Sequence, residues 1–244
     1  GKMVNMVINN KIISAEEGMT ILEAAKRNNI IIPTLCYLDC VHQVGSCRIC
    51  VVEVEGAKSL QASCMVAVQE GMVVRTNSER VKKARKVLYE LMLSDHPRDC
   101  LNCSRNQNCE LQKIGELLQV SESRFEGEKS RSMIDDSSPS IVRDSSKCIL
   151  CRRCITVCNE VQGVGVLNAQ KRGFRTYIGP AADFQLNTVN CAYCGQCTTV
   201  CPVGALKERD STQAVWEALF DKSKRVVIQT APAIRAALGE EFGY

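Results

Sequence analysis

The chain has 244 residues, enough for one or two ordinary domains, with 24% charged residues, 5% aromatic residues and 16 cysteines. So many cysteines and so few aromatic residues predict several small modules, each organised by a metal centre. A secreted disulfide scaffold is disfavoured because the N-terminal residues alternate between polar and apolar side chains, without the apolar run of a signal peptide. No stretch approaches the roughly 18 apolar residues of a membrane span, so we expect a protein of the reducing cytoplasm.

The N-terminal region predicts a β-grasp arrangement. Residues 3–9 and 11–14 predict a β-hairpin. Thr20 and Glu23 form a T-x-x-E capping box, which predicts a helix that ends near Asn28. Further strands are expected at residues 51–54, 59–62 and 73–76.

A first set of cysteines follows the predicted helix. Its members are separated by ten, two and thirteen residues and are Cys36, Cys47, Cys50 and Cys64. A long loop, a C-x2-C pair and a distant fourth cysteine are typical of plant-type [2Fe–2S] proteins, although the first gap is wider here. A structural zinc ion on the same cysteines is the alternative. We interpret Cys40 as a free thiol and His42 as a surface residue, since four ligands are already present.

A long helix and a mixed set of ligands come next. Ser78 is expected to cap a helix that ends at Asp95 and packs an apolar stripe in the core, namely Val81, Ala84, Leu88, Leu91 and Met92. The second set has the spacing H-x3-C-x2-C-x5-C and comprises His96, Cys100, Cys103 and Cys109. Such a set holds a structural zinc ion as readily as an iron–sulfur cluster, so the spacing leaves both open. Another helix is expected over residues 110–120.

The centre of the pattern is a duplicated motif, C-x2-C-x2-C-x3-C. It occurs at Cys148, Cys151, Cys154 and Cys158, and again at Cys191, Cys194, Cys197 and Cys201. Three thiolates on a tight loop bind one [4Fe–4S] cluster, and the fourth cysteine ligates the other cluster. We therefore expect one cluster on Cys148, Cys151, Cys154 and Cys201, and the second on Cys191, Cys194, Cys197 and Cys158. Zinc or disulfides are the alternative.

The remaining segments carry no ligand pattern. Residues 121–140 are polar and serine-rich, which is typical of a linker or a surface strap. Residues 163–165 (Gly-Val-Gly) are too short for a dinucleotide-binding fingerprint, so we expect no NAD or flavin site in this chain. After the last cysteine we expect a helix, a strand and a second helix, at Thr212–Phe220, Arg225–Gln229 and Pro232–Leu238.

The formal net charge of +4 counts every cysteine as a neutral thiol. An oxidised cluster with four thiolates carries about −2, and one with three thiolates and a histidine about −1. Four such centres would bring the loaded protein to about −3. Because the aromatic residues are few and scattered and no basic patch is visible, we expect no nucleic-acid partner.

Together these motifs resemble the N-terminal half of [FeFe]-hydrogenases, and equally the N-terminal part of the large iron–sulfur subunit of NADH dehydrogenase. In both families the histidine of an H-P-x-D-C motif ligates a [4Fe–4S] cluster. Residues 96–100 match that motif, so the resemblance favours a cluster over zinc on His96. Residues 229–243 are similar to the opening of the hydrogenase catalytic domain. No cysteine follows Cys201, so the ligands of the catalytic H-cluster are missing and we assign no catalytic residue.

The resemblance implies an α+β fold. It joins a β-grasp [2Fe–2S] ferredoxin domain, a small helical [4Fe–4S] domain with one His and three Cys ligands, and a two-[4Fe–4S] bacterial-ferredoxin-like domain. The expected divisions are 1–78 for the β-grasp domain, 79–120 for the His-ligated domain, 121–140 for a linker, 141–209 for the two-cluster domain and 210–244 for the start of a hydrogenase-like domain, as a remnant or cut short.

The implied function is electron transfer through one [2Fe–2S] and three [4Fe–4S] clusters, in an oxidoreductase complex of the kind that can bifurcate electrons. The implied partners are a flavin- and NAD(P)H-binding iron–sulfur subunit, a small [2Fe–2S] subunit and ferredoxin, so we expect a hetero-oligomer with flavin and NAD(P) only on the partners. We expect a relay subunit that ends at Tyr244. The alternative is the relay half of a longer [FeFe]-hydrogenase.

Overall fold

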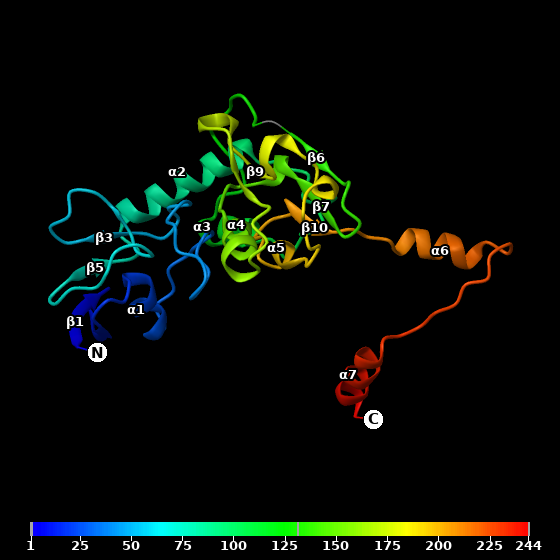
Figure 1. The fold of residues 1–244 in the computed structure, drawn as a ribbon. Helices are drawn as coiled ribbons and strands as arrows, with labels where there is room; N and C mark the ends of the chain where they lie inside the picture. The colour runs from blue at the N-terminus through cyan, green and yellow to red at the C-terminus, as the bar shows by residue number, and fades with distance from the viewer. Residues whose placement is uncertain (1, 131, 244) are drawn as a thin grey trace. The chain divides into compact units, whose positions relative to one another are not determined.

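The computed structural model describes residues 2–130 and 132–243. They form two compact units, Gly1–Glu208 and Arg209–Tyr244. All sixteen cysteines lie in the larger unit, which combines three sheets with helices of different lengths (Figure 1).

The larger unit begins with a five-stranded mixed sheet in the order β2-β1-β5-β3-β4. Its strands are β1 (Met3–Ile8), β2 (Lys11–Glu16), β3 (Val51–Val54), β4 (Gln61–Ala62) and β5 (Val73–Arg75). Strands β1 and β5 are parallel and the other pairs are antiparallel. The predicted hairpin, the later strands and the helix α1 (Ile21–Arg27) are confirmed. Thr20 caps α1 as expected: its side chain accepts from the Glu23 N–H, and the Glu23 carboxylate accepts from the Thr20 N–H at 2.7 Å.

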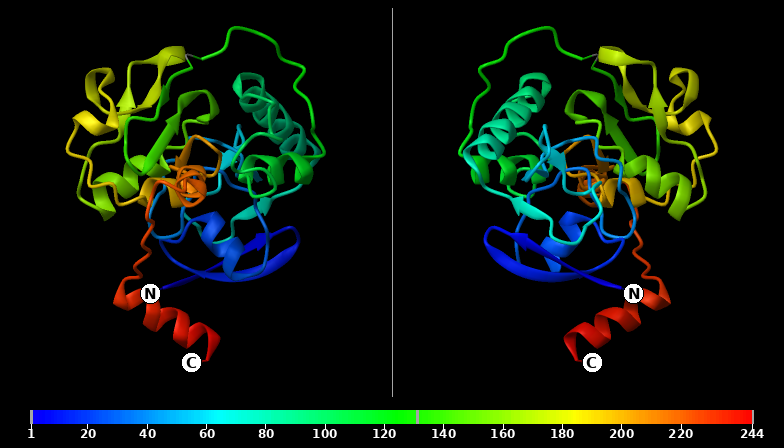
Figure 2. Two further views of the ribbon diagram at one scale, coloured as in Figure 1. Left: turned by 90° about the vertical axis from the view of Figure 1, so that its right-hand side faces the viewer. Right: turned by 90° about the vertical axis from the view of Figure 1, so that its left-hand side faces the viewer.

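Two helices follow, α2 (Glu79–Asp95) and α3 (Glu110–Leu118), and they pack against each other (Figure 2). Ser78 caps α2, as predicted, by accepting from the Val81 N–H. The expected apolar stripe is wrong at Leu91, which is 50% exposed. The buried face of α2 instead runs through Val81, Arg85 and Tyr89, because the Arg85 guanidinium reaches back to the Val51 carbonyl at 2.8 Å.

The polar segment after α3 lies along α2 (Figure 2). The Arg124 guanidinium pairs with the Glu90 carboxylate at 2.6 Å. Further on, the Ser130 N–H donates to the Asp95 carboxylate at 2.6 Å. These contacts tie the segment to the second half of α2 at Glu90 and Asp95.

The rest of the larger unit holds the duplicated motif. A three-stranded antiparallel sheet has the order β10-β7-β6, and β8 pairs with β9 in a hairpin. The strands are β6 (Ile134–Asp135), β7 (Ile141–Asp144), β8 (Asn168–Gln170), β9 (Tyr177–Gly179) and β10 (Leu206–Glu208). The short helices α4 (Arg153–Thr156) and α5 (Gln196–Thr199) lie side by side next to β10 (Figure 1).

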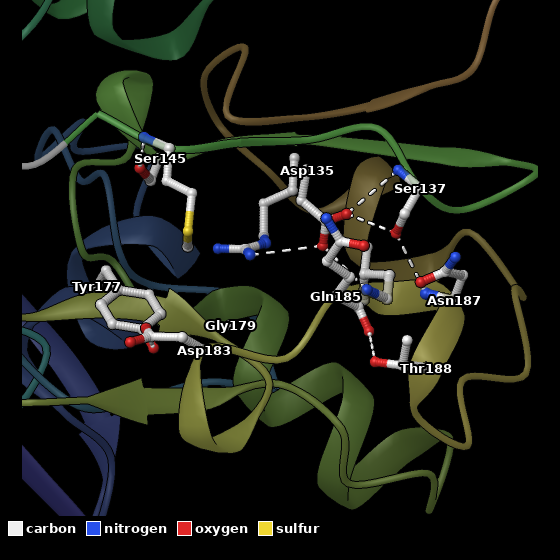
Figure 3. A network of polar contacts seen from close by, with 12 residues as sticks. Asp135, Ser137, Ser145, Tyr177, Gly179, Asp183, Gln185, Asn187 and Thr188 are labelled. Carbon is white, nitrogen blue, oxygen red and sulfur yellow. Dashed lines mark hydrogen bonds and ion pairs between the residues drawn. The ribbon is translucent and has the colours of Figure 1, made fainter.

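Asp135 anchors this sheet to the segment before the second motif (Figure 3). Its carboxylate accepts from the Ser137 hydroxyl at 2.6 Å and from the Leu186 N–H at 3.0 Å, and it pairs with the buried Arg143 guanidinium at 3.5 Å. Ser137 in turn accepts from the Asn187 N–H. Burial opposes the charged form of Asp135, but these hydrogen bonds and Arg143 hold the pKa of the carboxyl below its usual value.

The smaller unit contains α6 (Thr212–Phe220) and α7 (Pro232–Phe242), both expected from the sequence, with Pro232 at the first turn of α7. The strand expected at 225–229 is wrong, because those residues take no regular structure. A strand needs a neighbour to pair with, and the described residues 209–243 contain no other strand. No helix in the described part of either unit is long and apolar enough to cross a membrane.

Candidate metal centres

Four cysteines meet beside the first sheet and form what we call the β-grasp site. Each is at most 6% exposed, and they are Cys36, Cys47, Cys50 and Cys64. Cys50 directly precedes β3 and Cys64 follows β4, so the register of these paired strands brings their sulfur atoms within 3.4 Å of each other. Gly45 and Arg48 take left-handed backbone angles, with φ of 61° and 59°, which turns the loop tightly around Cys47.

The thiols of the β-grasp site share protons in pairs. A hydrogen bond from Cys47 lowers the pKa of Cys36 to about 5, and one from Cys64 lowers the pKa of Cys50 to about 6, in both cases against the effect of burial. Those same bonds, together with burial, raise the pKa values of the donors Cys47 and Cys64. Only two of the four thiols ionise readily, so a set of four thiolates would need the added positive charge of a metal.

The His96 site lies where α2 ends and α3 begins. Its four side chains line one cavity of about 570 Å³, and they are His96, Cys100, Cys103 and Cys109. The Nδ1 atom of His96 is buried and has no hydrogen-bond partner among the residues that the structure describes. Burial, aided by Lys147, lowers the pKa of His96 and keeps the imidazole neutral, which is the form that binds metals. An unpartnered buried nitrogen beside three thiols fits a metal ligand.

The His96 site is built against the segment that carries the end of the second motif. A Cβ atom at Gly204 would lie 2.6 Å from the Cys103 sulfur, so any other residue would force the Cys103 side chain out of its present position. The Glu110 N–H donates to the Pro202 carbonyl at 2.9 Å, and the Arg105 guanidinium donates to the Thr198 carbonyl at 2.7 Å. The N-terminus of α3 is therefore held directly on the loop that follows α5.

The duplicated motif yields two further sets, each drawn from both copies. We call them the Cys148 site and the Cys191 site. One enclosed cavity is lined by Cys148, Cys151, Cys154 and Cys201, and another by Cys158, Cys191, Cys194 and Cys197. Short helical turns after each loop carry the fourth cysteine away from its own motif, so that Cys158 and Cys201 each line the cavity of the opposite copy.

The two motif loops repeat the same backbone geometry. Leu150 and Arg152 have φ of 55° and 65° in the first loop, and Tyr193 and Gly195 have φ of 52° and 72° at the equivalent positions of the second. These left-handed residues turn backbone N–H groups toward sulfur, as where the Leu150 N–H donates to the Cys148 thiol at 3.4 Å. Both loops are thus shaped to present three sulfur atoms and to hydrogen-bond them.

Burial makes these thiols reluctant to ionise. It raises the pKa of Cys148 to about 11 and that of Cys151 to about 12, and it raises the pKa of Cys154 well above its ordinary value. In the Cys191 site it raises the pKa of Cys197 to about 12. Iron would compensate the charge of the thiolates as they lose their protons. Within residues 2–130 and 132–243, no three His, Cys, Asp or Glu side chains form a group that could hold a single metal ion.

The β-grasp site and the Cys148 site are joined through the Cys151 carbonyl. That oxygen accepts from His42 Nε2 at 3.0 Å, and the Ser46 hydroxyl lies 3.5 Å from it. His42 Nδ1 meets the Thr156 hydroxyl at 2.5 Å. The expectation of a surface position for His42 is wrong, because the side chain is 2% exposed and braces the two loops together. Cys40 is exposed and does not line either cavity of the duplicated motif.

The sequence analysis did not find the structural roles of two residues in these loops, His42 and Arg153. Nothing near His42 in the sequence marks its contact with Thr156, which is 114 positions away. The sequence does contain a sign of the role of Arg153. The first motif has Arg152 and Arg153 between its second and third cysteines, where the second motif has Gly195 and Gln196, so only the first motif carries positive charges there.

Three family models together cover most of the larger unit. Residues 1–79 match the 2Fe-2S iron-sulfur cluster binding domain. Residues 85–124 match the NADH-ubiquinone oxidoreductase-G iron-sulfur binding region, and residues 138–207 match the ferredoxin-like domain of NADH-quinone oxidoreductase subunit 3. The expected order of [2Fe–2S], [4Fe–4S] and ferredoxin-like regions is thereby confirmed. The individual ligands of each cluster remain predictions.

Curated relatives include hydrogenases and NADH dehydrogenases. The chain is 49% identical to NADP-reducing hydrogenase subunit HndD of Solidesulfovibrio fructosivorans, over 99% of this chain and 42% of the relative. It is 34% identical to iron hydrogenase 1 of Clostridium pasteurianum, over 98% of this chain and 42% of the relative. It is also 34% identical to the mitochondrial NADH-ubiquinone oxidoreductase 78 kDa subunit of Candida albicans, over 84% of this chain and 28% of the relative. The chain thus spans less than half the length of each of these relatives.

A solved structure agrees with these relatives. A chain in the crystal structure of an NAD+-reducing [NiFe]-hydrogenase in the H2-reduced state superposes with a TM-score of 0.79 and 30% identity. The match covers 85% of this chain and 88% of that one. The chain therefore belongs to the iron–sulfur electron-relay family that unites hydrogenase subunits with the large iron–sulfur subunits of NADH dehydrogenases.

Proposed function

We propose that this chain is an electron-transfer subunit that holds one [2Fe–2S] and three [4Fe–4S] clusters. The [2Fe–2S] cluster belongs to the β-grasp site, and the [4Fe–4S] clusters belong to the His96, Cys148 and Cys191 sites. When bound, each cluster supplies a one-electron store whose potential is set by charge, by hydrogen bonds to sulfur and by exposure. In this proposal the chain buries the sulfurs, orients the loops and excludes water.

The observation that carries the proposal is the direct contact between ligand loops within one compact unit. The β-grasp loop meets the Cys148 loop at the Cys151 carbonyl, and the His96 loop meets the second motif through Arg105 and Thr198. The Cys148 and Cys191 sites exchange their fourth cysteines. Four redox centres joined in this way form a continuous path for electrons.

The ends of the path lie outside this chain. Because the sequence offers no nucleotide-binding fingerprint, electrons enter from a flavin- and NAD(P)H-binding partner, with a small [2Fe–2S] subunit beside it, and leave to ferredoxin or another acceptor. The name of one relative, NADP-reducing hydrogenase subunit HndD, supports a hetero-oligomer linked to a pyridine nucleotide. We propose such a complex, in the cytoplasm, with electron bifurcation as one of its modes.

A test of the ligand sets uses the exchanged fourth cysteines. Cys201→Ser should disturb the [4Fe–4S] signal of the Cys148 site and spare the Cys191 site, whereas Cys158→Ser should do the opposite. The measurement is iron and sulfide content with EPR of the reduced protein, prepared without oxygen. Cys40→Ser is the matched control and should leave iron content unchanged. If each variant disturbed the cluster of its own motif instead, the ligand assignment would be wrong.

A second candidate is the relay portion of a longer [FeFe]-hydrogenase. It is favoured by the two hydrogenase relatives, of which the chain spans 42% each. The intact denatured mass of the protein from its native source separates the two. A mass matching 244 residues supports a relay subunit, and a much heavier chain supports the hydrogenase, with its active site in the additional part.

A further inference from the structure

Arg153 contacts three segments of the chain at once. Its guanidinium forms a two-pronged ion pair with Glu110, with nitrogen–oxygen distances of 2.6 and 2.8 Å. The same group donates to the Tyr37 carbonyl at 3.2 Å. These partners lie 43 and 116 positions away in the sequence. A forked guanidinium can satisfy two partners in fixed directions, which an ammonium group cannot do.

The three segments belong to three different sites. Arg153, Tyr37 and Glu110 each adjoin a cysteine, namely Cys154 of the Cys148 site, Cys36 of the β-grasp site and Cys109 of the His96 site. One side chain therefore fixes the mutual placement of three ligand loops. The Cys191 site has no such contact in its own loop, since Gln196 stands at the position equivalent to Arg153.

The charge of Arg153 is held away from water. Its side chain is 4% exposed, whereas that of Glu110 is 41% exposed. The two hydrogen bonds to the Glu110 carboxylate offset this burial, and because a guanidinium does not lose its proton in proteins, Arg153 is a fixed positive charge beside Cys154. Its Nε atom is buried and has no hydrogen-bond partner in the part of the chain that the structure describes. A donor in this position is available to an acceptor that the protein itself does not supply.

We propose that Arg153 is a positioning residue that clamps the β-grasp, His96 and Cys148 loops together and, as a buried fixed cation, raises the reduction potentials of the β-grasp and Cys148 clusters. The inference rests on the ligand sets proposed above. Reduction adds a negative charge to a cluster, and a nearby cation stabilises that charge more strongly where water cannot screen it. The Cys191 site, which has Gln196 instead, is left at a lower potential, so the duplicated motif is made electrically asymmetric.

The test is a redox titration of the cluster-loaded protein, followed by EPR, with Arg153→Gln as the main variant. This change installs the residue of the second motif. We expect the one-electron equilibria of the β-grasp and Cys148 clusters to shift about tenfold toward the oxidised form, which is about 59 mV in each potential. The cluster of the Cys191 site should keep its potential and serves as the reference within the same molecule.

Two further variants distinguish an electrostatic effect of Arg153 on the clusters from a purely structural role. Arg152→Gln removes the same charge from the neighbouring residue, which is exposed, and should shift the potentials much less because water screens it. Glu110→Gln leaves Arg153 with less compensation and should raise the potentials of the β-grasp and Cys148 clusters. A purely structural role would move the Arg153 and Glu110 variants in the same direction. Opposite shifts support the proposal.

The inference is overturned if Arg153→Gln gives the same potentials as Arg152→Gln, or if Arg153→Gln and Glu110→Gln shift them alike. Should Arg153→Gln lose iron, Glu110→Gln decides, since an upward shift supports the proposal and its absence refutes it. The iron content of the unchanged protein distinguishes a failure of the proposed function from a failure of the inference about Arg153. Clusters missing from the unchanged protein contradict the proposed function, whereas four intact clusters with unmoved potentials contradict only the role of Arg153.

Discussion

The two histidines of the chain use their ring nitrogens in different ways. Both nitrogens of His42 are engaged, one with the Cys151 carbonyl and one with the Thr156 hydroxyl. Since a carbonyl oxygen only accepts, Nε2 of His42 carries a proton and donates. His96 instead has a buried Nδ1 without a partner among the described residues, beside three thiols. A brace needs both nitrogens for hydrogen bonds, whereas a ligand keeps one available for metal.

Replacing His96 with cysteine tests whether the imidazole is a ligand. His96→Cys should retain a cluster at the His96 site but lower its potential, on the order of 100 mV, because a thiolate adds a negative charge that a neutral imidazole does not. The measurement is a potentiometric titration followed by EPR. His42→Gln is the control and should leave the potential of that cluster in place. An unchanged potential in the cysteine variant would show that His96 is not a ligand.

At the scale of elements, the His96 site depends on a close approach between α3 and the loop after α5. The Glu110 N–H is bound to the Pro202 carbonyl, and Gly204 lies against the Cys103 sulfur. Because a Cβ atom at position 204 would stand 2.6 Å from that sulfur, the Cys103 side chain or one of the two loops would have to move. The absence of a side chain at Gly204 is therefore part of the site's geometry.

Gly204→Ala should weaken the His96 site selectively. The added methyl group displaces Cys103, so we expect loss or alteration of that cluster's EPR signal and a loss of about 1–3 kcal/mol in the free energy of unfolding by urea. Gly127→Ala is the matched control, because no described atom lies within 4 Å of its added methyl group and its backbone needs no left-handed angle. If both variants behaved alike, the contact with Cys103 would not matter.

Features that depend on residues close together in the sequence were predicted, whereas features that depend on residues far apart in the sequence were not. The caps at Thr20 and Ser78 and the loops of the duplicated motif are set by residues a few positions apart, and they were predicted. The brace at His42 depends on a partner 114 positions away and the clamp at Arg153 on partners 43 and 116 positions away, which no local pattern encodes. Leu91 fits a helical stripe and is still exposed, because Arg85 takes part of the buried face of α2.

At the scale of the whole molecule, the proposed metal centres are built into two hydrophobic cores. One apolar cluster fills the β-grasp sheet and contains Cys50 and Cys64, while Cys36 and Cys47 belong to the larger cluster around the other sites. The β-grasp site thus bridges both cores. In a chain with so few aromatic residues, the proposed clusters would add bonds between sulfur and metal that cross from one loop to another.

The same centres should reverse the sign of the molecule's net charge. The chain without iron has a formal charge of +4 at pH 7, and four clusters would bring it to about −3. Native electrophoresis at pH 7 without oxygen should therefore move the loaded protein toward the anode and the iron-free protein toward the cathode. The direction of migration depends on the sign of the charge, so partial unfolding of the iron-free chain does not affect it.

A variant that lacks one cluster calibrates this measurement. Cys201→Ser without the cluster of the Cys148 site should carry about −1 and migrate between the two forms, since about two negative charges are missing. A loaded protein that still moved toward the cathode would mean that fewer than four centres are bound. In that case the iron content of the same sample gives their number, and the comparison with Cys201→Ser shows whether the duplicated motif is the part left unfilled.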